Sequence, residues 1–289
     1  MFYSNAHTHS TWCDGKDTLE DMAQAAIDLG FTDLGFTCHS PALFDPSCPG
    51  VKNEVAYQTA LRELKEKLAG QLNISIGLEW DYYSADPIDG YDYTVGSVHY
   101  FPPRQGIFRS VDESPESLMK TLDEWYQGDK LQMVRDFYDT VVRHIHQNQS
   151  KIVGHFDLIT KFNEKNPWLD EDSGEYQAIA LKALNDVVDI IQTYDGMVEI
   201  NTGAISRNWR TTPYPNPFLL KQLKKRDCPV IITSDSHETT TLTCHFPETV
   251  ELLKSLGFTE TMQLKDGIFQ PIPFSWLIFK EFIFPKAEK

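Results

Sequence analysis

The chain has 289 residues, of which 41% are hydrophobic and 24% charged, with a formal net charge of −16. This composition is typical of a globular protein with one large or two small domains. The acidic excess argues against nucleic acid as the main partner, because phosphate backbones attract basic surfaces, but a small phosphorylated substrate needs only local cations.

Strand-like and helix-like segments alternate along the chain. We predict strands over residues 2–6, 31–37, 73–78, 93–98, 151–153, 197–200 and 229–233. We predict helices over residues 18–29, 54–68, 115–148 (with a break near Gly128), 175–194, 217–225 and 246–256. Ser114 before Pro115 is a typical helix start. We interpret the apolar stretch 274–284 as a docking strand, the end of a helix, or a tail.

Repeated strand–helix units predict an α/β fold with a parallel sheet and helices outside it. Seven such strands over this length favour a TIM-like barrel rather than an open sheet. No linker or internal repeat divides the chain. We therefore expect a single barrel domain over residues 1–289, in which residues 271–289 form a possible C-terminal extension.

Histidines and carboxylates recur just after the predicted strands. His7 and His9 are one residue apart, so on an extended chain both side chains face the same side. Equivalent positions hold His39, Glu79, His99, His155, Asp235 and His237. The C-terminal ends of barrel strands share one face, where active sites lie, so we expect these side chains to converge. His144 and His146 fall in a predicted helix and are expected at the surface, and His245 has no assigned role.

Such a set of neutral imidazoles and carboxylates suits zinc, iron or manganese better than calcium. It contains more ligands than one tetrahedral ion can use, so we expect two or three divalent metal ions with bridging carboxylates. Neighbouring metal ions can stabilise both the attacking and the leaving oxygen in phosphoryl transfer.

The motifs resemble the polymerase and histidinol phosphatase (PHP) superfamily, and in particular its histidinol-phosphate phosphatase branch. The resemblance is carried by His7-Thr8-His9-Ser10, Phe36-Thr37-Cys38-His39-Ser40-Pro41, Gly77-Leu78-Glu79, Gly96-Ser97-Val98-His99, Gly154-His155-Phe156-Asp157-Leu158, Glu199-Ile200-Asn201-Thr202 and Asp235-Ser236-His237. It implies a distorted (β/α)7 TIM-like barrel with its metal site at the C-terminal ends of the strands.

The resemblance also implies a role for each ligand. The first ion would be held by His7, His9, Glu79 and Asp235. Glu79 would bridge to a second ion on His99 and His155, and His39 and His237 would hold a third. Many relatives have a further histidine shortly after the His-x-His pair, where this chain has Trp12-Cys13-Asp14-Gly15. Asp14 is the expected substitute, with Asp17 behind it.

The implied activity is metal-dependent hydrolysis of the phosphate monoester L-histidinol phosphate to L-histidinol and phosphate, a step of histidine biosynthesis. The hypothesis is that a hydroxide bridging the first two ions attacks phosphorus in line. The third ion, or a metal-bound water near Asp235 and His237, would assist the leaving alkoxide. Lys161 and Arg207 follow strand ends and are expected to bind phosphoryl oxygens. The candidates for binding the cationic organic group are Asp14, Asp17, Asp112 and Glu113.

Two alternatives stay open. The same metals could serve another small phosphate ester, a nucleotide, a phosphodiester or single-stranded DNA, although the net charge disfavours DNA. The second alternative is a non-catalytic metal-binding module or a structural barrel. It is disfavoured because structural metal sites are usually closed and hold a single ion. The sequence does not reveal the oligomeric state.

The cysteine pattern and the termini bear on the compartment. The chain has an odd number of cysteines, which are Cys13, Cys38, Cys48, Cys228 and Cys244, and no Cys-x-x-Cys pair. A disulfide framework is therefore not expected, and a cytoplasmic location is favoured. The N-terminus lacks a basic region followed by an apolar core, so we expect no signal peptide. Residues 274–284 are too few to span a membrane, and no membrane partner is expected.

Overall fold

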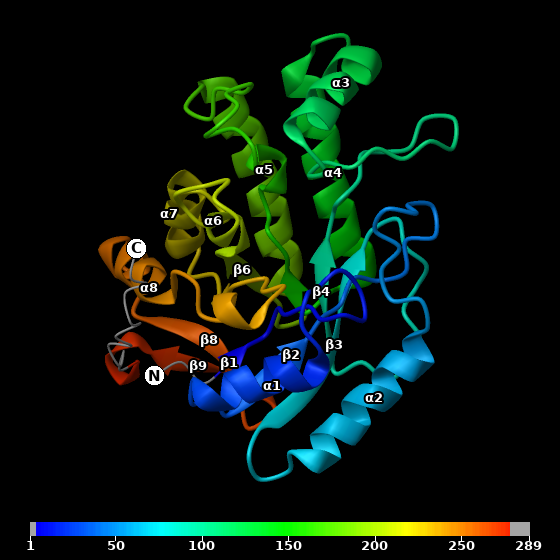
Figure 1. The fold of residues 1–289 in the computed structure, drawn as a ribbon. Coiled ribbons are helices and arrows are strands. Elements are labelled where there is room, and N and C mark those ends of the chain that lie inside the picture. The colour runs from blue at the N-terminus through cyan, green and yellow to red at the C-terminus, as the bar shows by residue number, and fades with distance from the viewer. Residues whose placement is uncertain (1–3, 278–289) are drawn as a thin grey trace, which may run out of the picture.

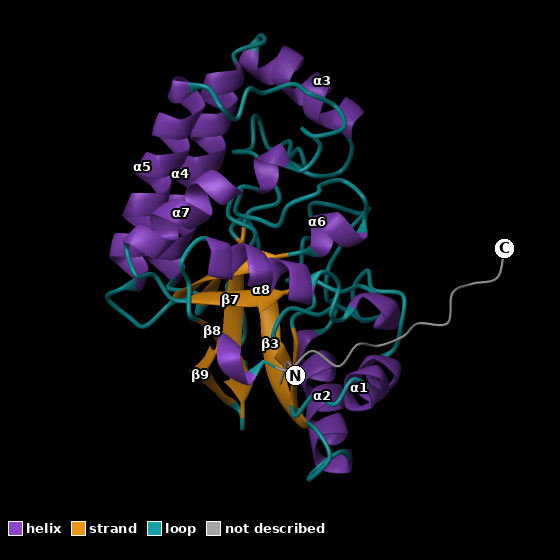
Figure 2. Cartoon of the chain, turned by 90° about the vertical axis from the view of Figure 1, so that its left-hand side faces the viewer, coloured by secondary structure: helices purple, strands orange, loops and turns teal. Residues whose placement is uncertain are grey.

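Parallel strands form the centre of the fold, and helices lie around them (Figure 1, Figure 2). The structure is a computed structural model that describes residues 4–277. Nine strands follow one another across a single sheet: β1 (Ser4–Asn5), β2 (Asp33–Phe36), β3 (Asn73–Asp81), β4 (Tyr93–Ser97), β5 (Ile152–Val153), β6 (Met197–Asn201), β7 (Val230–Thr233), β8 (Glu260–Lys265) and β9 (Ile268–Pro273). Strands β1 to β8 pair in parallel, and β9 pairs antiparallel to β8.

Helices connect most of these strands. The α-helices are α1 (Leu19–Asp28), α2 (Glu54–Lys67), α3 (Pro115–Tyr126), α4 (Lys130–Asn148), α5 (Gly174–Ile191), α6 (Gly203–Ser206), α7 (Pro217–Lys225) and α8 (Phe246–Ser255). Short 3₁₀ helices cover Leu158–Thr160, Thr239–Thr241 and Phe274–Trp276. Helices α4 and α5 run side by side (Figure 1), and the hydroxyls of Tyr138 and Tyr176 meet between them at 2.9 Å. No described helix is long and apolar enough to cross a membrane.

The first and seventh strands meet at their C-terminal ends, which closes the barrel there. Thr8 forms a parallel bridge with Ser236, in which His9 N donates to Ser236 O at 2.8 Å and Ser236 N donates to His7 O at 3.3 Å. At the opposite end, β8 lies between β7 and β1, where Leu264 N donates to Ser4 Oγ at 3.0 Å. The expected distorted (β/α)7 barrel is confirmed, with β8 inserted at the N-terminal end of its seam.

Local signals explain where the helices begin and end. Ser114 Oγ accepts a hydrogen bond from Ser117 N at 3.0 Å, which caps α3 as its Ser-Pro start predicts. The predicted break falls at Gln127 and Gly128, both with positive φ, and Asp129 caps α4 after it. The interior of the barrel is filled by Ala6, Tyr93, Val95, Ile152, Met197 and Ile231. A larger apolar core lies between the sheet and the helices.

Three features differ from the sequence-based expectation or extend it. Strands β8 and β9 were not predicted, because β9 contains Pro271 and Pro273, which only an edge strand accommodates. His144 was expected at the surface but is fully buried, with its Nε2 2.7 Å from Trp80 O, whereas His146 is exposed as predicted. Of the stretch 274–284, Phe274 is buried, and residues 278–289 lie outside the described part. All five cysteines are free in the described structure.

Tight packing around Tyr93 gives a test of the barrel interior. A Cβ added at Gly77 in β3 would lie 2.9 Å from the carbonyl oxygen of Phe36 and 2.9 Å from the Tyr93 ring. We expect Gly77→Ala to lower the free energy of unfolding by about 1–3 kcal/mol, as overpacked cores do, measured by denaturant titration. Gly174→Ala at the start of α5 meets no atom within 4 Å and is the control. Equal stability of the two variants would contradict the tight interior.

Candidate metal centre

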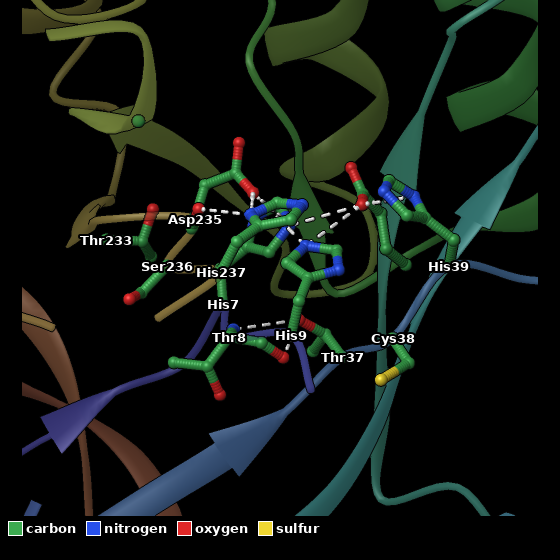
Figure 3. Close-up of polar contacts among 12 residues, drawn as sticks. His7, Thr8, His9, Thr37, Cys38, His39, Thr233, Asp235, Ser236 and His237 are labelled. Atoms are coloured by element: carbon green, nitrogen blue, oxygen red, sulfur yellow. Dashed lines mark hydrogen bonds and ion pairs between the residues drawn. The ribbon is translucent and has the colours of Figure 1, made fainter. Parts of the chain in front are cut away.

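The His-x-His motif lies at the seam of the barrel, where the chain after β1 pairs with the chain after β7. Thr8, between the two histidines, turns its hydroxyl away to donate to Gly35 O at 2.7 Å. His7 and His9 are both fully buried, with ring centroids 5.2 Å apart, and point toward Asp235 and His237 from the opposite side of the seam (Figure 3). The Thr8–Ser236 pairing therefore brings the His-x-His and Asp-x-His motifs face to face.

The carboxylate of Glu79 lies at the centre of the imidazoles. Its Oε2 is 3.3 Å from His7 Nε2, 3.4 Å from His9 Nε2 and 2.8 Å from His39 Nδ1. Its Oε1 is 3.3 Å from His99 Nε2 and 2.9 Å from His155 Nε2. Each oxygen of one buried carboxylate thus faces a different set of imidazole nitrogens, which is the arrangement a bridging ligand requires.

Asp235 and Asp14 complete the set of acidic groups. Asp235 Oδ1 lies 3.1 Å from His9 Nε2 and 3.6 Å from His7 Nε2. Its backbone adopts a left-handed φ of 48°, a strained conformation that often marks a functional position. Asp14 lies 3.6 Å from His39 Nε2 and 3.2 Å from His237 Nε2. The stretch that lacks the additional histidine therefore supplies a carboxylate at the same cluster.

Three compact groups of possible ligand atoms result, each within 4.8 Å: His7, His9 and Glu79; His39, Glu79 and His99; and His9, Asp14, His39 and His237. These groups overlap with the sets implied by the resemblance but are not identical to them. The first lacks Asp235, the second contains His39 in place of His155, and the third includes His9 in addition. His7 Nε2, His9 Nε2 and Glu79 Oε2 are buried and have no hydrogen-bond partner among the described residues. Unsatisfied buried polar atoms are costly, and these three all face one point, so the donor set fits divalent metal ions.

Electrostatics within the cluster oppose the effect of burial. Burial disfavours the ionised form of Glu79, but His39, His7 and His99 outweigh it and hold the pKa of Glu79 well below its usual range. Burial likewise opposes protonation of His99, yet Glu79 and Asp81 raise its pKa to about 10. The cluster therefore favours positive charge between its carboxylates, supplied by protons or by metal ions.

A second layer of carboxylates, not assigned a role from the sequence, holds the imidazoles. Glu199 in β6 is fully buried, with Oε1 2.5 Å from His7 Nδ1 and Oε2 accepting from His155 N at 2.6 Å. Asp81 Oδ2 accepts from His99 N at 2.8 Å and lies 3.4 Å from His99 Nδ1. A charged residue within an apolar strand is the signal that could have identified Glu199, because isolated charges are rarely buried.

A cavity of about 690 Å³ opens onto the cluster and is lined by Asp14, His39, His99, His155, Asp235 and His237 among others. Lys161 and Arg207 also line it. Arg207 Nη2 donates to Asp235 Oδ2 at 2.9 Å, and Lys161 Nζ donates to Asp112 Oδ2 at 2.8 Å. Glu113 lies on the wall, whereas Asp17 accepts a hydrogen bond from Thr239 N and is not part of the lining.

The fold and the site define an α/β barrel with a cluster of histidines and carboxylates that suits divalent metal ions. The chain belongs to the PHP domain family, whose model matches residues 5–203. A probable histidinol-phosphatase of Schizosaccharomyces pombe is 27% identical, with the alignment covering 91% of this chain and 90% of that protein. One of Deinococcus radiodurans is 27% identical over 88% of this chain and 93% of its own.

A solved structure supports the fold. The histidinol phosphate phosphatase of Lactococcus lactis, in complex with zinc, L-histidinol and phosphate, aligns with a TM-score of 0.68 and 20% sequence identity. The alignment covers 93% of this chain and 98% of that one. The barrel architecture is therefore shared along almost the whole length of both proteins.

The unsatisfied ligand atoms predict stabilisation by metal. Zinc added to the metal-free protein should raise the melting temperature, since a ligand at one hundred times its Kd contributes about 2.7 kcal/mol. His9→Ala should lose most of this shift, because His9 belongs to two of the three ligand groups.

His146→Ala, on the exposed face of α4, is the matched control and should keep the full shift. Differential scanning calorimetry with and without zinc measures the shift in melting temperature for both variants. An undiminished shift in His9→Ala would remove His9 from the metal centre.

Proposed function

We propose that the protein is a metal-dependent phosphatase that hydrolyses L-histidinol phosphate to L-histidinol and phosphate. The observation that carries the proposal is the convergence of buried, unsatisfied imidazole and carboxylate atoms next to a cavity that other members of the cluster line together with Arg207 and Lys161. The names of the relatives and the zinc, histidinol and phosphate bound by the Lactococcus lactis protein support this substrate.

The ligands present could hold two or three divalent ions. Zinc, iron and manganese all accept imidazole and carboxylate ligands. His7, His9, Glu79 and Asp235 would hold the first ion, Glu79, His99 and His155 the second, and Asp14, His39 and His237 the third. When bound, such ions acidify water and neutralise the charge that develops on phosphoryl oxygens. Glu79 would serve two of these positions, because its two oxygens face different imidazoles.

The chain's own cations would orient the phosphate group. The Arg207 side chain is 35% exposed and is paired with Asp235, and its remaining N–H groups can reach an anion in the cavity. Lys161 is held on the same wall by Asp112, and its ammonium group provides a second point charge. Asp112 is paired with Lys161, Asp14 is a proposed metal ligand and Asp17 does not line the cavity. Of the four carboxylates considered from the sequence, Glu113 is therefore the one proposed to bind a cationic organic group.

Asp235 and His237 are the proposed residues beside which the leaving alkoxide would take up a proton, from a metal-bound water that they would position as ligands. His237 Nδ1 lies 3.3 Å from Arg207 Nη1, so its ring stands next to the guanidinium proposed to bind the phosphate. The Asp235 carboxylate contacts both His9 and Arg207 and therefore links the ligand cluster to the phosphate position.

A substrate panel tests the proposal directly. Phosphate release is measured for histidinol phosphate, other small phosphate monoesters and mononucleotides, with the metal content of the protein determined in parallel. We expect the highest kcat/KM for histidinol phosphate. Comparable or higher values for a nucleotide or another ester would favour the alternative substrate class, and full metal loading without any hydrolysis would contradict a phosphatase.

The role of Arg207 predicts a specific kinetic change. Arg207→Ala should raise KM for the phosphorylated substrate about tenfold to a hundredfold, because a hydrogen bond to a charged group contributes about 1.5–3 kcal/mol. Bound metal, measured by atomic emission, should stay at the wild-type level. The control is Arg135→Ala on the exposed side of α4. Unchanged kinetics in Arg207→Ala would exclude it from phosphate binding.

A further inference from the structure

Four hydrogen-bond donors surround the buried carboxylate of Glu199. Its Oε1 accepts from His7 Nδ1 at 2.5 Å and from Thr233 Oγ1 at 2.6 Å. Its Oε2 accepts from His155 N at 2.6 Å and from Asn201 Nδ2 at 3.0 Å. Only a carboxylate offers two acceptor oxygens, so the ionised side chain satisfies all four donors at once.

We propose that Glu199 is a positioning residue that fixes the metal-binding tautomer of His7. By accepting the proton of His7 Nδ1, it leaves the lone pair of Nε2 directed toward Glu79 and Asp235. Carboxylates behind metal-bound histidines generally orient the ring and increase its basicity. The inference rests on the metal binding in the proposed function, but not on the identity of the substrate.

The same carboxylate also holds the chain at a second ligand. His155 follows β5, which consists of only two residues, Ile152 and Val153. The hydrogen bond from its backbone N–H to Glu199 ties this short connection to β6 at the position from which the His155 ring reaches Glu79. One side chain therefore sets the ring state of His7 and the backbone position of His155, which belong to different ligand sets.

The geometry makes the near-isosteric change Glu199→Gln informative. The His155 N–H can only donate, and Asn201 is fixed because its Oδ1 accepts from Gly203 N at 2.8 Å. The Gln carbonyl must therefore face His155 and Asn201, and its NH₂ group must face His7 and Thr233. Thr233 can then accept through its hydroxyl oxygen, but His7 can accept only by moving its proton from Nδ1 to Nε2. That proton occupies the nitrogen atom that would bind the metal.

The test compares zinc affinity by chelator competition in the wild type, in Glu199→Gln and in a matched control, Glu171→Gln. Glu171 also accepts from two amide groups, those of Asn163 and Asn216, but contacts none of the proposed ligands. We expect zinc affinity to fall about 10–100-fold in Glu199→Gln, the usual range for the loss of such a partner, and to stay at the wild-type level in Glu171→Gln. Wild-type affinity in Glu199→Gln would overturn the proposal.

A measurement on the wild type keeps the inference testable if the variant does not fold. In zinc-loaded protein with ¹⁵N-labelled histidine, nuclear magnetic resonance should show the His7 proton on Nδ1 and the metal on Nε2. Zinc on Nδ1 would overturn the proposal, and a wild type that binds no zinc would overturn both it and the metal centre. Zinc binding with the expected tautomer but without hydrolysis of histidinol phosphate would contradict the proposed function alone.

Discussion

The burial of one ionised carboxylate, Glu79, is the constraint on which the site depends. A carboxylate that is 1% exposed is strongly unfavourable unless positive charge or hydrogen-bond donors surround it. Five imidazoles from four different strand ends supply that environment, with nitrogen atoms 2.8–3.4 Å from its oxygens. Even so, Glu79 Oε2 and two imidazole nitrogens have no hydrogen-bond partner in the described chain. The protein side chains thus form an incomplete coordination shell that a cation completes.

Barrel geometry brings these groups together from distant parts of the chain. Parallel strands end at the same face, so side chains that follow successive strands meet although up to 230 residues separate His7 from His237. Two backbone bridges set the positions of the ligand motifs relative to one another. The Thr8–Ser236 bridge aligns the first and last motifs, and the His39–Glu79 bridge extends the pairing of β2 and β3 beyond Phe36. Because these pairings are made by the backbone, they position the ligand residues through the sheet itself.

The sequence predicts the residues that would contact the metal ions better than it predicts the carboxylates that hold those residues in place. The strands of the barrel, the break at Gly128 and the converging His and Asp residues follow from periodicity, turn residues and motif spacing, which are local signals. Glu199 and Asp81 act through hydrogen bonds to other strands, and His144 through Trp80 O, so their partners become visible only in the folded chain. Strands β8 and β9 were missed for a related reason, since their pairing with each other and with β7 compensates for weak local strand propensity.

Charge in the cavity shows why an anionic ligand would need additional cations there. Its lining contains seven carboxylates and three basic side chains, and each basic group is already paired: Lys16 with Glu238, Lys161 with Asp112 and Arg207 with Asp235. An anionic phosphate ester would therefore meet a negative surface if the imidazoles were neutral. Asp235 faces His9 with Oδ1 and Arg207 with Oδ2, so divalent ions held beside Glu79 and Oδ1 would add positive charge to the cavity while Arg207 keeps its own contact. Metal ions would therefore make the cavity more favourable for a phosphate group, in a protein whose formal net charge is −16.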